Sequence, residues 1–163
     1  MTSQNSGHHE NLRAIRQELF QLLEGMDYCL DWKADPDDWS AKEVICHLLD
    51  TPPGGVPTVL AGSLAGELLE FDLWADESNI SPEQLAWDLS EVRGQLEGYF
   101  RDLEQALNLA QGTDLTARQI MVHQRNRHWD QPRPVSWLVE RLFAGHWREH
   151  LAQLREIRES LGL

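Results

Sequence analysis

The apolar positions of this chain repeat at the period of an α-helix along most of its length. A first amphipathic stripe runs from Leu12 to Met26, with apolar residues three and four positions apart. A second stripe follows Ser40 and Glu43, whose spacing is that of a capping box. We expect helices over both segments, joined by an extended connector at residues 27–38 that contains a proline among aspartates.

Prolines and glycines between residues 52 and 57 interrupt the second helical segment. A proline removes a backbone donor and clashes with the preceding turn, so the helix is expected to end or bend there. Helical spacing resumes between Val59 and Leu68. Residues 51–70 therefore form either a broken helix or a lid-like loop followed by a new helix, and the pattern leaves both open.

A third helical segment begins at Ser81. Ser81, Pro82 and Gln84 provide an N-cap, a first-turn proline and a capping-box partner. The apolar stripe then continues for several turns towards Gly112, a residue type typical of helix C-termini. We expect one long helix over this segment.

A long connector, residues 113–134, separates the third segment from the last one. A short helix is expected within it, near residues 117–123. The last helix is predicted from about Val135 to Leu161, with Gly162 just beyond its end.

Four long amphipathic segments without a credible alternating strand predict an all-α protein, a four-helix bundle. The long connectors after the second and third segments allow crossover connections. A chain of 163 residues suits one domain with a real core. We therefore expect a single domain over residues 11–163, preceded by a flexible, polar N-terminus at residues 1–10.

The charge balance narrows the range of partners. Fourteen Lys and Arg residues against 27 Asp and Glu give a formal net charge of −13, which repels nucleic acid and anionic membrane surfaces. No signal-like segment and no apolar run of about 18 residues is present, so we expect a cytoplasmic protein. Cys29 and Cys46 are too few for a disulfide framework and are expected to be small buried residues.

Two histidines stand on the apolar stripe of the last helix, where leucines are expected. His146 and His150 are four residues apart and lie within about 25° of the centre of that stripe, taking about 100° per residue. Their imidazoles therefore lie one above the other. Two buried imidazoles need partners for their nitrogens and cannot both carry a charge cheaply, and a divalent metal removes both problems. The alternative is a pair of core histidines bonded to backbone, tryptophan or carboxylate groups.

A tight metal site needs a third ligand from another helix, and His47 is the natural candidate. It lies at the border of the apolar face of the second helix, beside Val44 and away from Ile45 and Leu49. Periodicity alone leaves open whether His47 faces the core.

The order His-Trp-Arg-Glu-His at residues 146–150 also matches the H-x-x-E-H motif of inverted zinc peptidases, in which the glutamate is a general base. Those enzymes need an acidic ligand well downstream, and only residues 151–163 follow. Glu149 is therefore expected to be partly solvated, paired with Arg148 or Arg155, or orienting an imidazole. A di-iron carboxylate site is excluded, because no histidine has a glutamate three residues before it.

The remaining histidines are expected outside the site. His8 and His9 lie in the polar N-terminus, and His123 and His128 lie in the connector, whose second half could lean over the site. Trp147 is next to the centre of the stripe and either fills the core or lines a pocket.

The combination of these motifs resembles the DinB-like superfamily of metalloenzymes. It consists of Trp-Ser-Ala-Lys-Glu at residues 39–43, His47 on the same helix, and His146-x-x-x-His150 on the last helix. The resemblance covers about residues 12–161. It implies a DinB/YfiT-like four-helix bundle with a crossover connection between helices 2 and 3.

The resemblance also implies a site. In that family one histidine from the second helix and two from the last bind a divalent metal, usually zinc or nickel, with open positions for water or substrate. This implies that His47, His146 and His150 are metal ligands. Characterised relatives include S-transferases that use bacillithiol or mycothiol and a mycothiol-dependent maleylpyruvate isomerase. A small-molecule substrate and a low-molecular-weight thiol as cosubstrate are thus implied. The interruption at 52–57 and the connector at 113–134 depart from the family pattern, where a pocket mouth would be.

The leading hypothesis is a metal-dependent thiol S-transferase or hydrolase that acts on a small molecule, with no catalytic residue assigned. The alternative is a non-catalytic helical bundle that binds a metal or a small molecule. A homodimer is compatible with the seven tryptophans, which offer spare aromatic surface. Neither nucleic acid nor a membrane is expected as a partner.

Overall fold

The computed structural model describes residues 2–78 and 80–163, with side chains from residue 7 onward. These residues form six α-helices, one π-helix and three strands. In chain order the elements are α1 (Thr2–Leu23), α2 (Ala41–Leu49), α3 (Val56–Leu64), β1 (Glu70–Leu73), α4 (Pro82–Leu85), α5 (Leu89–Leu109), β2 (Gln119–Gln124), β3 (Trp129–Pro134), the π-helix η1 (Leu138–Gly145) and α6 (His146–Ser160).

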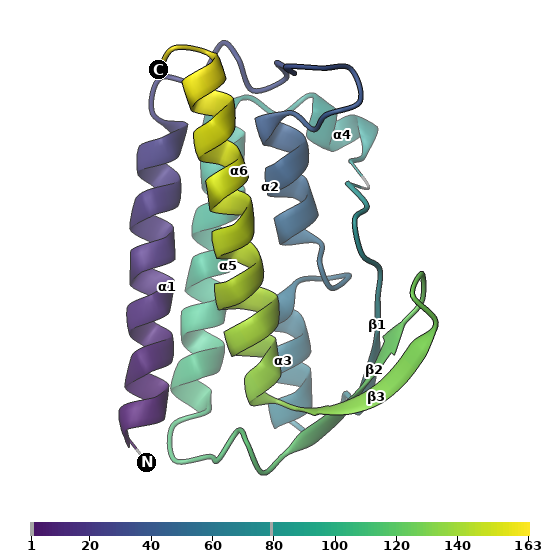
Figure 1. Ribbon diagram of the computed structural model, residues 1–163. Helices are drawn as coiled ribbons and strands as arrows, with labels where there is room; N and C mark the ends of the chain where they lie inside the picture. The colour runs from purple at the N-terminus through teal and green to yellow at the C-terminus, as the bar shows by residue number, and fades with distance from the viewer. Residues whose placement is uncertain (1, 79) are drawn as a thin grey trace.

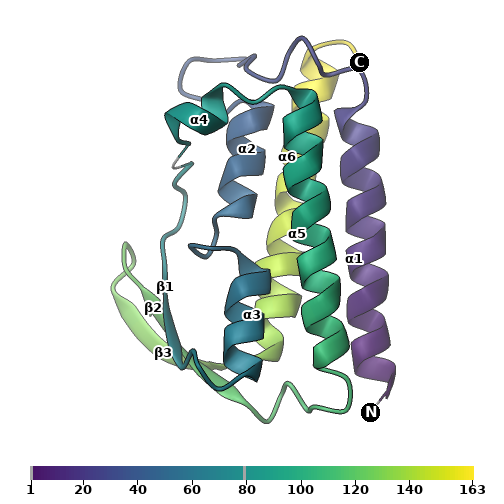
Figure 2. The same ribbon diagram turned by 180° about the vertical axis from the view of Figure 1, so that it is seen from behind.

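The long helices pack side by side, with α6 in front of α5 in Figure 1 and behind it in Figure 2, and the sheet flanks one edge of this helical part. Helix α1 packs against α5 and α6, α2 packs against α6 and α5, and α3 packs against α5 and η1. Helices α1 and α6 run in one direction, and α2, α3 and α5 run in the other (Figure 1). The segment from α3 to α5 passes back along the edge through β1 and α4 (Figure 2), and this return makes α2, α3 and α5 parallel.

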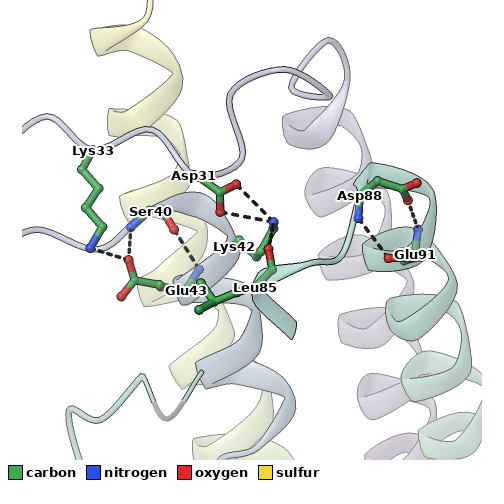
Figure 3. Close-up of polar contacts among 8 residues, drawn as sticks. All are labelled: Asp31, Lys33, Ser40, Lys42, Glu43, Leu85, Asp88 and Glu91. Carbon is green, nitrogen blue, oxygen red and sulfur yellow. Dashed lines mark hydrogen bonds and ion pairs between the residues drawn. The ribbon is translucent and has the colours of Figure 1, made fainter. Parts of the chain in front are cut away.

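Capping boxes fix where α2 and α5 begin (Figure 3). The Ser40 hydroxyl accepts from the Glu43 backbone N–H at 3.1 Å, and the Ser40 N–H donates to Glu43 Oε1 at 3.2 Å. Asp88 and Glu91 make the same reciprocal pair at 2.8 and 3.1 Å. The expected single helix from Ser81 is therefore two helices, because α4 ends after about one turn and Asp88 starts α5 afresh.

A buried lysine joins three segments at the start of α2 (Figure 3). Lys42 is 3% exposed, and its Nζ donates to the Leu85 carbonyl at 2.9 Å and lies 3.2 Å from an Asp31 carboxylate oxygen. The contact ties the connector after α1 and the end of α4 to α2. A buried ammonium group is tolerated here because it has both a carboxylate and a carbonyl partner.

The sequence left open whether residues 51–70 continue the second helix in broken form or begin with a loop. In the structure α2 ends at Leu49, and after a short loop a new helix, α3, begins at Val56. Gly55 lies there with φ of 87°, a backbone conformation that favours glycine. A Cβ at this residue would lie 3.1 Å from both the Leu49 carbonyl oxygen and the Tyr99 ring. The close approach of Tyr99 therefore requires glycine at the start of α3.

The all-α prediction is wrong for residues 70–73 and 119–134, which form a three-stranded sheet in the order β1-β2-β3. Strand β1 pairs in parallel with β2, and β2 pairs antiparallel with β3. The short helix expected near 117–123 is β2, whose residues Ile120, Val122 and Gln124 alternate as buried positions. A sheet with so few alternating apolar residues depends on the pairing of β1 with β2, which lie far apart in the chain.

Helix α1 begins at Thr2, within residues 1–10, and the flexibility expected for this segment stays a prediction. His8 is 6% exposed, and burial lowers its pKa. The His8 imidazole is buried on the inner face of the helix, where an apolar side chain is usual. The polar residues around it gave no indication of this burial. Met1 lies outside the described residues.

An aromatic cluster occupies the core between α5 and the last helix. Trp147 has no exposed surface, and its ring centroid lies 4.7 Å from that of Tyr99, 5.4 Å from that of Phe100 and 5.3 Å from that of Phe143. Trp147 therefore fills the core and does not line the cavity beside the histidines. Within residues 2–78 and 80–163, no helix has the length and apolar character needed to cross a membrane.

Candidate metal centre

Three histidine side chains converge between α2 and α6. His47 lies in α2, and His146 and His150 lie on the first turns of α6. The Nε2 atom of His146 is 3.0 Å from that of His47 and 3.1 Å from that of His150. The packing of α2 against α6 thus brings together the three histidines that the sequence singled out, and they lie close enough to bind one metal ion.

The outer nitrogen of His47 is held by the backbone. Its Nδ1 is 2.6 Å from the Glu77 carbonyl oxygen and 3.3 Å from the Thr51 hydroxyl. A carbonyl oxygen only accepts hydrogen bonds, so it favours the tautomer in which Nδ1 carries the proton. The Nε2 lone pair of His47 then faces the other two histidines.

His150 is oriented in the same way by a side chain one turn further along α6. Its Nδ1 lies 2.8 Å from Gln153 Oε1, which is also an acceptor. Both His47 and His150 therefore direct an unprotonated Nε2 towards a common point. Such outer partners are the usual means by which proteins fix the tautomer and ring orientation of a metal-binding histidine.

His146 lies between the other two histidines and is the most strongly perturbed of them. Burial, with the neighbouring His150 and His47, lowers its pKa to about 3, and the positive charge of Arg141 adds to the effect. Burial also lowers the pKa of His47. Both imidazoles are therefore neutral at physiological pH, which is the form that binds metals.

The geometry fits a metal ion better than it fits a self-contained histidine cluster. With Nδ1 protonated on His47 and His150, two Nε2 lone pairs face His146, whose single Nε2 proton can satisfy only one of them. If His146 carries that proton, its buried Nδ1 has no hydrogen-bond partner among the described residues. An ion accepting three Nε2 lone pairs would remove this mismatch.

The spacing of the nitrogens also suits a first-row metal ion. A tetrahedral zinc ion with Zn–N bonds of about 2.0–2.1 Å separates its ligands by about 3.3 Å. Octahedral coordination at similar bond lengths separates neighbouring ligands by about 3.0 Å. The observed 3.0 and 3.1 Å lie at this scale. An all-imidazole donor set suits zinc, nickel, copper or iron.

Trp39 packs against two of the three imidazoles from the segment just before α2. Its ring is nearly parallel to that of His150, at 12° with centroids 6.1 Å apart, and its centroid lies 4.9 Å from that of His47. Trp39 therefore covers one side of the cluster and excludes water from it.

The cluster opens into a cavity of about 360 Å³ between the last helix and the sheet side of the molecule. All three histidines line it, together with Trp74 and Asp76 after β1 and Trp137 before η1. This volume is at the small end of the range for small-molecule sites. Trp147 and the core lie away from the opening, so a ligand can reach the histidines.

The pairing of Glu149 with Arg148 or Arg155 that the sequence suggests does not occur. Glu149 also makes no hydrogen bond to an imidazole of the cluster. Its carboxylate lies 3.5 Å from Arg141 at an exposed position. Arg148 instead donates to Asn11, and Arg155 pairs with Glu18. These two contacts join α6 to α1, so the arginines have a structural role.

The remaining histidines lie apart from the cluster. His123 is on the outer face of the sheet, 2.6 Å from Asp130, and His128 is exposed in the turn between β2 and β3. The connector does flank the cavity, but it does so through Gln124 and Arg127.

Sequence reasoning missed several residues of this site: Trp39, Thr51, Glu77, Gln153, Arg127 and Arg141. Gln153 could have been found, since it lies three residues after His150 on one helix face. Glu77 acts through its backbone carbonyl, for which the side-chain type gives no signal.

Comparison of the chain with protein-family models, curated proteins and solved structures gave no match in any of the three. Inferences about function therefore depend on the residues of the site itself.

Proposed function

We propose that this protein binds a divalent metal ion through His47, His146 and His150 and acts as a metal-dependent transferase, of the thiol S-transferase type, or as a hydrolase on a small molecule. The observation that carries the proposal is the convergence of three Nε2 atoms, 3.0 and 3.1 Å apart, at a cavity of about 360 Å³. Zinc and nickel are the ions we expect first.

We also propose that the helical part belongs with the DinB-like four-helix bundles. The parallel course of α2–α3 and α5 supports a crossover between the second and third long helices (Figure 1). The capping box at Ser40 and Glu43 and the positions of the three histidines on the second and last long helices support the same assignment. The three-stranded sheet is then an addition to these helices.

The residues of the chain perform separate tasks in this mechanism. The three histidines would hold the ion as neutral ligands, while the Glu77 carbonyl and Gln153 Oε1 retain the Nδ1 protons of His47 and His150. Trp39 would limit the access of water from one side, and the cavity would admit the substrate from the other. An ion held by three neutral imidazoles would keep its full positive charge and, when bound, would lower the pKa of a thiol or water.

Metal analysis of purified, untagged protein tests the first part of the proposal. After dialysis against a weak chelator and reconstitution, the parent should hold one equivalent of zinc or nickel. His47→Ala and His150→Ala should hold little. His123→Ala is the matched control, because it removes a histidine on the outer face of the sheet, away from the cluster. An apo parent after reconstitution, or equal metal in all four proteins, would overturn the assignment.

Turnover assays test the second part. Electrophilic and ester substrates should be screened with and without bacillithiol, mycothiol or glutathione. Turnover that requires a thiol in the parent and is lost in His150→Ala identifies a transferase. Turnover that does not require a thiol and is lost in the same variant identifies a hydrolase. A metal-loaded protein without turnover in either screen would favour a non-catalytic metal-binding bundle.

A further inference from the structure

An arginine stands on the same helix face as the central histidine because the helix is widened just before it. The backbone N–H of His146 donates to the Arg141 carbonyl, five residues back, as in a π-helix. In an α-helix, residues five apart point about 140° away from each other. In the wider turn this angle is much smaller, so η1 brings Arg141 towards the face of His146, and both residues line the cavity.

A second arginine lines the cavity from the opposite side. Arg127 lies in the turn between β2 and β3, and its backbone N–H donates to Gln124 Oε1 at 2.8 Å. Gln124 is itself 3% exposed, so the turn is anchored to a buried side chain. The turn between β2 and β3 therefore places Arg127 at the cavity.

The carboxylates near these arginines leave most of their donors available. Arg127 Nη2 lies 3.2 Å from Asp76, and Arg141 Nη1 lies 3.5 Å from Glu149, with each pair largely exposed to solvent. A guanidinium has five N–H donors in a fixed fork. A single long contact to an exposed carboxylate occupies little of that capacity.

The charged residues that line the cavity balance one another, whereas the whole molecule is strongly acidic. The chain has a formal net charge of −13. At the cavity the two arginines balance Asp76 and Glu149, so a divalent ion on the histidines would leave an excess of positive charge. Arg141 beside such an ion is unfavourable unless an anion lies between them. The arrangement thus favours a ligand with a negative charge.

Part of the cavity wall is apolar. Trp74 is a large apolar side chain with 41% of its surface exposed, and it lines the cavity with Trp137, Leu73 and Leu142. An exposed tryptophan beside a polar site provides a surface for an apolar or aromatic group.

We propose that this cavity binds a small organic carboxylate, whose charged end lies among the histidine site, Arg141 and Arg127 and whose apolar body packs on Trp74 and Trp137. This inference rests on the proposed metal-binding function and specifies the class of its substrate. The carboxylate group provides the two oxygens that a guanidinium fork recognises.

Isothermal titration calorimetry tests the proposal by measuring the affinity of the zinc-loaded protein for phenylacetate. The amide 2-phenylacetamide serves as a neutral ligand of the same shape. Phenylacetate should bind, and the amide should bind at least about tenfold more weakly, as expected for loss of a charge-assisted hydrogen bond. Arg141→Gln should weaken phenylacetate binding by about 10- to 100-fold and leave the amide unaffected. Arg127→Gln should weaken it by a smaller factor, because the charge of Arg141 acts on His146 whereas that of Arg127 is not among the influences on this imidazole.

Arg101→Gln on α5 is the matched control, since Arg101 is exposed and does not line the cavity. It should bind phenylacetate as the parent does. Circular dichroism checks that each variant is folded. If Arg141→Gln does not fold, the affinity of Arg127→Gln for phenylacetate decides the test.

Zinc content, measured on every sample, separates this inference from the proposed function. A parent without zinc overturns the proposed function. A zinc-loaded parent that binds phenylacetate and the amide equally, binds neither, or keeps its affinity in both arginine variants overturns the carboxylate proposal and leaves the metal site standing.

Discussion

At the scale of single residues, the site depends on what lies behind each imidazole. His47 and His150 have acceptors on their outer nitrogens, 2.6 and 2.8 Å away, and these acceptors set which nitrogen faces the cavity. His146 Nδ1 makes no regular hydrogen bond, although the Leu142 backbone interacts with this imidazole, and the ring is packed between the other two. The three histidines are therefore held differently, and substitutions around them should have different effects.

Replacing Gln153 should weaken metal binding without removing a ligand. Gln153→Leu deletes the acceptor of the His150 Nδ1 proton, so we expect an affinity about 10- to 100-fold lower than that of the parent. Gln153→Glu keeps an acceptor and should retain tight binding. Competition with a chromophoric chelator measures both. The same Gln-to-Leu change at exposed Gln105 on α5 is the control, and a Gln153→Leu variant with parental affinity would show that Gln153 has no orienting role.

The metal-free protein should lose stability as the pH falls below about 6.5. The pKa of His146 is lowered to about 3 in the folded state from 6.5. The unfolded chain therefore takes up a proton between these values when the folded protein does not, and stability decreases towards acid. One such group contributes a slope of about 1 kcal/mol per pH unit.

Urea unfolding in the presence of a chelator at pH 7.5, 6.5 and 5.5 measures this slope. His146→Gln removes the titrating group and should give a flatter dependence on pH than the parent. Parallel curves for the two proteins would contradict the assignment.

At the scale of elements, local hydrogen bonds decide where helices begin, and a change of helix type decides where side chains point. The capping box at Asp88 divides a segment whose apolar stripe predicts one helix. The π-helix η1 keeps Arg141 on the face of His146. Regular apolar spacing does not reveal either feature, because each depends on backbone hydrogen bonds.

Loss of the cap at the start of α5 should cost measurable stability. In Asp88→Ala the backbone N–H of Glu91 loses its acceptor, so the free energy of unfolding should fall by about 1 kcal/mol. Asp102→Ala removes an exposed aspartate from the interior of the same helix and should be nearly neutral. Urea unfolding compares the two variants, and equal losses would mean that Asp88 does not act as a cap.

At the scale of the whole molecule, a bound metal would link segments that are distant in the chain. His47 comes from α2, His146 and His150 from α6, and Glu77 from the segment between β1 and α4. A ligand set drawn from several elements exists only in the folded state, so metal binding should stabilise the whole fold.

Thermal unfolding with and without zinc at pH 7.5 should show this linkage. At a free zinc concentration of 100 times the dissociation constant, the expected gain is about 2.7 kcal/mol. His47→Ala should show no comparable gain, and His123→Ala should behave as the parent does. A similar shift in His47→Ala would indicate that zinc stabilises the protein at another site.

The sequence by itself determined the long helices, the capping box at Ser40 and the placement of His146 and His150 on one helix face, because these depend on local spacing and on periodicity along one helix. It could not determine the sheet, since β1 and β2 are short and each is stable only when paired with the other. It could not decide whether His47 faces the core, because that depends on how α2 packs against α6.

Only the tertiary structure decided what surrounds the histidines. The Glu77 carbonyl, Arg127 and Trp74 reach the site from segments whose composition is that of ordinary loops and turns. Their positions follow from the parallel pairing of β1 with β2 and from the wide turn of η1. The histidine pair on the last helix is thus a property of the sequence pattern, whereas the charge and shape of the cavity beside it are properties of the fold.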